Sequence, residues 1–121
     1  MIRTYTINIT TTGTAGSATG SGTTSRPVNG MIAAIKIDFT SQAGTADTTI
    51  VDGHGQPILT LTNVNADGWW YPHPEIHDNT GAELNKQTCP FAVDSYVTAS
   101  IVQSNAGSAV VTLLVNEGGR G

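Results

Sequence analysis

Apolar residues recur at every second position in the hydrophobic stretches of this chain, and no stretch keeps the period of a helix. Residues 5–10 (YTINIT) alternate in this way, and so do residues 35–39 (IKIDF). Successive side chains of a strand point to opposite faces of a sheet, so the pattern predicts strands with one buried and one solvated face. The predicted fold class is all-β, an antiparallel β-sandwich or jelly roll with a long Gly/Ser/Thr-rich loop.

Turn-forming residues separate the predicted strands, which are typical of a sandwich. The strands are expected over residues 2–12, 31–40, 47–51, 58–64, 96–103 and 109–115. The side chains expected to face inward include Tyr5, Ile7, Ile9, Val97, Ala99, Ile101, Val111, Leu113 and Val115. Residues 82–87 are ambiguous, because they are compatible with one helical turn that ends before Pro90.

The length of 121 residues predicts a single domain over residues 1–121. Residues 13–25 consist only of Gly, Ala, Ser and Thr, so they can bury little surface and are expected to form a flexible, exposed loop. The loop is either a simple connection or an arm that becomes ordered against a neighbouring subunit. A mobile C-terminal tail is expected over residues 116–121.

Charge and hydropathy exclude several kinds of partner. The net charge is −4 and the five basic residues are scattered, so no basic stripe is available for nucleic acid or for an anionic membrane surface. No apolar run approaches the roughly 20 residues that span a bilayer, and the N-terminus has no apolar secretory region. We therefore expect synthesis in a reducing cytosol, with no nucleic acid and no membrane as partner.

The segment around His73 is the strongest candidate for metal chemistry. His73, Glu75 and His77 would share one face of an extended strand, and Asp78 follows them. Imidazole and carboxylate suit zinc or another transition metal. Prolines stiffen the segment and no second-shell partner is evident, so a surface or interface loop is the preferred interpretation. We predict no cofactor and no bound metal.

No catalytic constellation is recognisable elsewhere in the sequence. The serines lack the Gly-x-Ser-x-Gly setting of a nucleophile elbow, and the glycines lack the spacing of a phosphate-binding loop. Cys89 is the only cysteine and is expected to be a small buried side chain. The sequence therefore predicts that the protein is not an enzyme.

Three of the seven aromatic residues are consecutive, at Trp69, Trp70 and Tyr71. Neighbouring strand residues point to opposite sides, so at most two of them share a face. One tryptophan is expected to seal the end of the core. The other would contact a partner protein or stack on a sugar ring, since large aromatic side chains are enriched at interfaces.

Four landmarks of the sequence resemble a known group of viral proteins. They are RPVNGMIAAI at residues 26–35, GQPILTLTN at 55–63, WYP at 70–72 followed by HDNTGA at 77–82, and a closing Val-x-Ala-x-Ile-Val hairpin. Over roughly residues 5–115 the chain resembles small structural proteins encoded in the head-gene regions of tailed bacteriophages, some of which are capsid cement or decoration proteins.

The resemblance implies a protein of the outer capsid surface of a virion that clamps neighbouring subunits of the major capsid protein, as a homo-oligomer (trimer or dimer). Contacts are then expected from the loop at residues 13–25, the segment 69–78 and the edge of the first strand. The predicted interface residues are Arg3, Tyr5, Thr14, Arg26, Trp69, Trp70, Tyr71, His73 and His77.

Two alternatives remain open at this point. The aromatic cluster would suit a carbohydrate- or receptor-binding β-sandwich module of a phage tail or surface structure. The third hypothesis is a metal-dependent enzyme that uses His73, Glu75 and His77.

Overall fold

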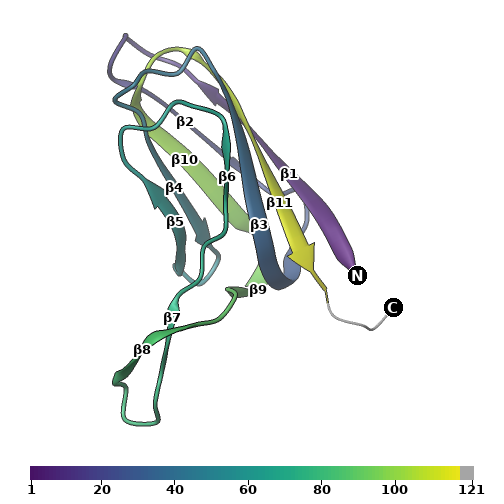
Figure 1. Cartoon of the computed structure of the whole chain (residues 1–121). Helices are drawn as coiled ribbons and strands as arrows, with labels where there is room; N and C mark the ends of the chain where they lie inside the picture. Colours follow the sequence, from purple (N-terminus) through teal and green to yellow (C-terminus); the bar gives the residue numbers. More distant parts are fainter. Residues whose placement is uncertain (118–121) are drawn as a thin grey trace.

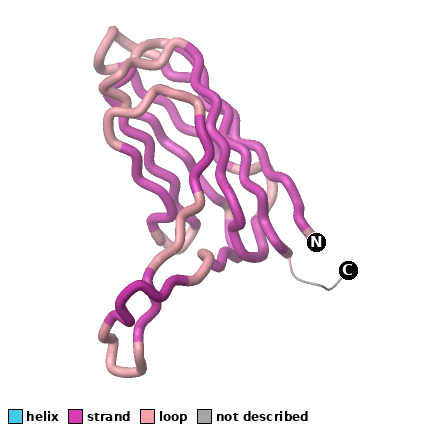
Figure 2. Tube along the Cα trace, viewed as in Figure 1, coloured by secondary structure: helices cyan, strands magenta, loops and turns pink. Residues whose placement is uncertain are grey.

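Strands and turns make up the whole of the described chain, residues 1–117 of a computed structural model, with no helix in that range (Figures 1 and 2). The predicted all-β class is confirmed. The strands are β1 (Ile2–Thr11), β2 (Ala18–Thr23), β3 (Val28–Thr40), β4 (Asp47–Asp52), β5 (Pro57–Leu61), β6 (Gly68–Trp70), β7 (Glu75–His77), β8 (Glu83–Thr88), β9 (Ala92–Ser95), β10 (Val97–Ser104) and β11 (Gly107–Asn116).

Two antiparallel sheets form the body of the molecule. The first has the order β1-β11-β3-β6, and β9 pairs with the part of β3 that precedes the β6 pairing. The second has the order β2-β10-β4-β5, and β7 and β8 form a separate two-stranded ribbon. A single bridge between Thr12 and Thr19 links the sheets where β1 turns into β2. The sandwich is therefore closed at this corner.

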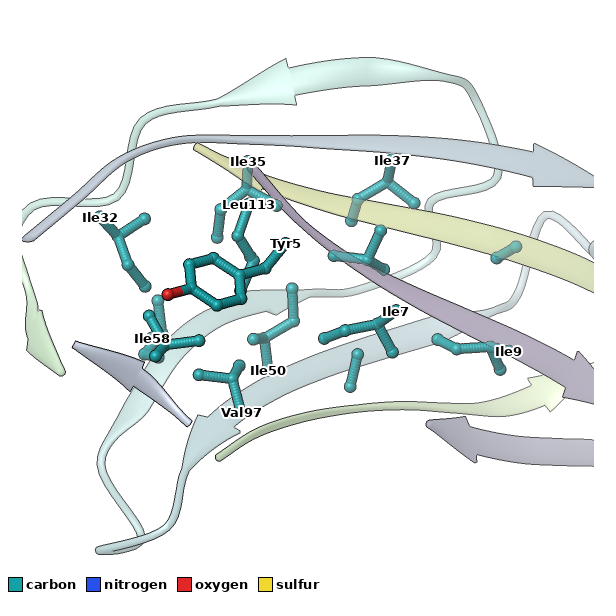
Figure 3. Packing of buried hydrophobic residues seen from close by; sticks show 14 of the residues in the cluster. Tyr5, Ile7, Ile9, Ile32, Ile35, Ile37, Ile50, Ile58, Val97 and Leu113 are labelled. Atoms are coloured by element: carbon teal, nitrogen blue, oxygen red, sulfur yellow. The ribbon is translucent and has the colours of Figure 1, made fainter. Parts of the chain in front are cut away.

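The core lies between the two sheets and is built from the alternating residues that the sequence singled out (Figure 3). All the side chains predicted to face inward are buried, and their polar neighbours on β1 are exposed. The second sheet adds Ile50 from β4 and Ile58 and Leu61 from β5. Burial of apolar side chains from both sheets is the main stabilising contribution to such a fold.

A β-bulge in β3 lets both even-numbered and odd-numbered residues of this strand reach the core. Ile32 and Ala34 pair with neighbouring residues of β11, whereas Ala33 between them has no partner. One extra residue reverses the alternation of a strand. Ile32 and Ile35 are consequently both fully buried, although three positions separate them.

The predicted loop over residues 13–25 is wrong in its second half, where β2 pairs with β10. Ala18 and Thr24 are buried. The glycines explain the error, because they permit a close approach to β1 rather than a loop. A Cβ atom on Gly20 would lie 2.2 Å from the carbonyl oxygen of Thr10, so only glycine lets the two strands come this close.

The segment before β9 also differs from expectation. Residues 83–88 form strand β8 and not a helical turn. Cys89, expected to be buried, is exposed. Its backbone N–H donates to the carbonyl oxygen of Pro74 over 3.1 Å, and this bond closes the base of the β7–β8 ribbon.

The expected tail begins later than predicted. Asn116 is the last residue of β11, and the N–H of Glu117 donates to the carbonyl oxygen of Met1 over 2.9 Å. Residues 118–121 of the predicted tail lie outside the described residues.

The β7–β8 ribbon projects from one end of the sandwich, away from both sheets (Figures 1 and 2). We call residues 74–89 the hairpin arm. Every residue of the arm is exposed except Pro74, Ile76 and Leu84, which are half-buried. The arm therefore contributes no side chain to the buried core.

Candidate functional site

The tip of the hairpin arm is held by one carboxylate. Asp78 Oδ1 accepts hydrogen bonds from the Thr80 hydroxyl (2.7 Å), the Thr80 N–H (2.9 Å) and the Ala82 N–H (3.0 Å). The bond from the Thr80 hydroxyl, followed by those from the backbone, holds the pKa of Asp78 below its ordinary value. A tip ordered by its own bonds loses little entropy when a partner binds it.

The two strands of the arm carry further charged groups. His77 Nε2 lies 3.9 Å from Glu83 Oε2, and Glu75 Oε2 accepts the N–H of Lys86 over 3.4 Å. With Asp78, the arm holds three carboxylates against one lysine. It is an acidic projection whose Glu75 and Glu83 side chains face solvent.

The arm does not assemble the metal site considered from the sequence. β7 spans only Glu75–His77, so His73 lies outside the strand that would have aligned it. The Nδ1 atom of His73 lies 3.1 Å from the carbonyl oxygen of Tyr71 instead. Within residues 1–117, no group of three or more His, Cys, Asp or Glu side chains is placed to hold a metal ion.

The aromatic cluster divides as predicted between core and surface. Trp70 is half-buried and packs against the core, and its ring occupies the space that a side chain at Gly68 would fill. Trp69 points the other way and is 47% exposed. Lys36, its cross-strand partner on β3, places Nζ 5.9 Å from the centre of the Trp69 ring. Tyr71, at 62%, is more exposed still.

A second charged group lies where β1 begins and β3 approaches. We call it the arginine cluster, formed by Arg3, Tyr5, Arg26 and Glu117. The Tyr5 hydroxyl donates to Glu117 Oε2, and Arg3 Nε donates to Glu117 Oε1 over 2.8 Å. The guanidinium carbon of Arg26 lies 5.4 Å from the centre of the Tyr5 ring, a cation–π contact.

Hydrogen bonding in this cluster favours the ionised carboxylate. The bond from the Tyr5 hydroxyl, and then that from Arg3, lowers the pKa of Glu117. Burial, and then the bond to Glu117, raises the pKa of Tyr5. Both oxygens of Glu117 are thus occupied, and among residues 1–117 no carboxylate forms an ion pair with Arg26.

A short turn anchors the strand that follows the arm. Between β4 and β5, the N–H of Gly53 donates to Ser95 Oγ over 2.8 Å, and His54 Nε2 lies 2.8 Å from Asp94 Oδ1. Asp94, chiefly through this hydrogen bond, raises the pKa of His54. Asp94 and Ser95 belong to β9, the strand that follows the arm. These two contacts therefore attach β9 to the β4–β5 turn of the second sheet.

The predicted interface residues fall into three places. Arg3, Tyr5 and Arg26 meet in the arginine cluster, although the Tyr5 ring is only 6% exposed and belongs to the core. Trp69, Trp70, Tyr71, His73 and His77 lie on β6, on the segment that leads into the arm, or on the arm itself. Thr14 is in the β1–β2 turn, at the end of β1 opposite the N-terminus (Figure 1).

Two residues of these surfaces were missed from the sequence. Glu117 fell in the predicted tail, and only the pairing of β1 with β11 brings it to Arg3. Glu83 fell in the ambiguous segment. The alternation of polar and apolar residues at 75–77 (EIH) and 83–85 (ELN) was a usable signal for an exposed ribbon, but the prolines beside it obscured it.

No protein-family model matches this sequence, and no curated protein matches it. The described residues enclose no pocket. They also contain no helix long and apolar enough to cross a membrane. The candidate site is therefore an outer surface, consisting of the hairpin arm with the neighbouring aromatic residues and the arginine cluster.

Proposed function

We propose that this protein is a non-enzymatic structural protein of a tailed-phage virion. In this role it is a cement or decoration protein that binds the major capsid protein on the outer surface of the head. The resemblance of its sequence landmarks to phage head proteins supports the proposal. The single structural observation that carries it is the projecting hairpin arm.

The arm has the properties of a docking element. A two-stranded hairpin is at best marginally stable alone in water, and this one packs against neither sheet of the body. Its half-buried Ile76 and Leu84 offer apolar surface that a partner would cover. Its tip is ordered by Asp78, so little conformational entropy is lost on binding.

The body suits a brace rather than a catalyst. Its two sheets share one continuous core, so forces applied at the arm are transmitted through a rigid unit. Each contact with a shell can be weak, since many copies linked through one particle act together. The modest net charge limits repulsion between crowded copies.

Binding to capsids provides the test. The purified chain is mixed with particles assembled from the major capsid protein of the same genome, and bound protein is measured by sedimentation. We expect saturable binding at a fixed ratio to the capsid protein. Trp69→Lys should weaken it, whereas Thr60→Lys, an exposed change on β5 of the other sheet, should not. Absence of binding, or location of the chain in the tail of the virion, would overturn the proposal.

A second function is favoured by one observation, the exposure of Trp69 and Tyr71. An exposed aromatic ring beside Lys36 and Asp38, whose side chains lie 3.6 Å apart, is also the chemistry of a weak sugar-binding surface. A glycan array would decide between the two functions. Binding that disappears in Trp69→Ala, without affinity for capsids, would favour a receptor-binding module.

A further inference from the structure

We infer that the hairpin arm of one copy binds the arginine cluster of a second copy, with Glu83 and Glu75 of the arm paired with Arg26. The inference deepens the proposed function and rests on it for the role of the arm as a docking element. The resemblance to phage head proteins implies a homo-oligomer, and the inference names one contact that would hold its copies together.

The surface that would receive the arm contains an arginine that is already oriented. Arg26 is exposed, and its guanidinium group is held over the Tyr5 ring. The nearby Glu117 is bound to Tyr5 and Arg3 instead, and no ion pair joins it to Arg26 within the described residues. A guanidinium group held over an aromatic ring still has N–H donors that can bind a carboxylate from another molecule.

The cluster is also the only part of the described chain where positive charge is in excess. Arg3 and Arg26 stand against the single carboxylate of Glu117. Of the other two basic residues of the described chain, Lys36 lies beside Asp38, and Lys86 is on the arm, which holds three carboxylates. Ile2, which is 56% exposed, adds apolar surface beside Arg3.

The hairpin arm is complementary to this surface in charge, because its carboxylates can accept hydrogen bonds from an arginine. Asp78 orders the tip through its Oδ1 atom, whereas Glu83 makes only a loose 3.9 Å contact with His77 and is exposed. Glu75 is bound only to a backbone N–H at 3.4 Å.

The positions of the two surfaces suit an assembly of identical copies. The arm leaves the body at one side of its lower end in Figure 1, and β1 begins at the other side of the same end. A contact between two different surfaces of identical chains is heterologous, and such contacts close into rings when the rotation permits. The arm of each copy would then reach the start of β1 in the next.

Sedimentation velocity of the full chain over a range of concentrations tests the contact without any capsid. We expect the weight-average sedimentation coefficient to rise with concentration, and to rise less in high salt, where exposed charge pairs are screened. Arg26→Glu should weaken association about tenfold or more, and so should Glu83→Lys, because each places like charges opposite one another.

Charge exchange provides the decisive result. The double variant Arg26→Glu/Glu83→Lys restores opposite charges across the contact, so its association should recover towards that of the natural chain. Thr60→Glu, which places a negative charge on the exposed face of β5 in the second sheet, is the control and should associate normally. Circular dichroism and the unfolding midpoint would establish that each variant is folded.

The failures of the two proposals are distinguishable. A chain that remains monomeric at its highest soluble concentration, or a double variant that associates no better than either single variant, would overturn this inference. Binding of that monomer to capsids would leave the proposed function standing. Self-association without capsid binding would support this inference and overturn the proposed function.

Discussion

Two glycines of β2 set how closely the sheets can approach at the corner of the sandwich. A Cβ atom on Gly22 would lie 2.4 Å from the carbonyl oxygen of Asn8, and backbone cannot yield as a flexible side chain can. Gly22→Ala should therefore lower the free energy of unfolding by about 3 kcal/mol. Urea denaturation measures this change.

The control for this prediction is Gly44→Ala. Nothing lies within 4 Å of a Cβ atom at Gly44. Its free energy of unfolding should stay within about 0.5 kcal/mol of the natural chain. Equal effects of the two substitutions would mean that β2 does not lie against β1 as described.

His54 gives the fold a dependence on pH near neutrality. Hydrogen bonding to Asp94 raises the pKa of His54 above 6.5, so the folded state favours the protonated ring. This stabilisation is fully present at a pH below the pKa of His54 in the unfolded chain. It is lost as the pH rises through the higher pKa of His54 in the folded protein. The free energy of unfolding should fall over this window, and fall less in Asp94→Asn. Chemical denaturation at several pH values measures both slopes, and identical slopes would contradict the role of the pair.

At the scale of elements, β2 replaces the second half of a predicted loop, and the predicted surface segment with the ambiguous residues after it forms the hairpin arm. The glycine-rich segment is the better candidate for an arm by composition, yet it forms a strand of the second sheet. The arm contains the β-branched Ile76 and alternating polar residues, yet it leaves the body. The composition of a segment indicates how much surface it can bury. The place of β2 depends instead on its close approach to β1, and the place of the arm depends on the pairing of β7 with β8.

The alternation of apolar residues was enough to predict most of the fold. β1, β10 and β11 lie where the period places them, with the expected faces buried. The pairing of β1 with β11 joins the two ends of the chain, and such long-range pairing leaves no local signal. For this reason the aromatic part of the candidate site was predictable, while Glu117 was not.

Shortening the arm separates its role from that of the fold. The N–H of Cys89 donates to the carbonyl oxygen of Pro74, so a two-residue Asn-Gly turn can replace residues 75–88 between them. Because the arm supplies no buried side chain, the free energy of unfolding should change by less than about 1 kcal/mol. Sedimentation with capsids should show binding reduced at least tenfold, by the loss of the proposed contacts.

Deletion of residues 14–24 is the informative contrast. A loop would tolerate it, but this deletion removes β2 and the buried Ala18 and Thr24. We expect no cooperative unfolding transition from that variant. A shortened arm that unfolds the protein, or a folded variant lacking residues 14–24, would contradict these assignments.

At the scale of the whole molecule, the two ends of the sandwich differ in chemistry. One end has the arginine cluster, where Glu117, directly after β11, binds Arg3 and Tyr5 of β1 in the same sheet. The other has a buried polar group around Gln42, in the connection between β3 and β4. The arm and the arginine cluster, which we propose as binding surfaces, lie at the first of these ends (Figure 1), whereas the Gln42 group connects the two sheets at the second.

Gln42 connects the sheets directly. Its Nε2 donates to Thr11 Oγ1 on β1 over 3.0 Å, and its Oε1 accepts from the hydroxyl of Ser104 on β10. Ser104 is fully buried and its oxygen also accepts the N–H of Ala43. Gln42→Leu should therefore cost about 2–3 kcal/mol in the free energy of unfolding, because it leaves a buried hydroxyl without an acceptor.

The coupling between the two side chains distinguishes a shared network from independent packing. In Gln42→Leu/Ser104→Ala the unpaired hydroxyl is gone, so the double variant should cost about 1–2 kcal/mol less than the sum of the single variants. Guanidinium denaturation of the four proteins gives the coupling, and a single transition in each would indicate that both sheets unfold together. Strictly additive costs would mean that the bond across the sheets does not hold this end of the sandwich closed.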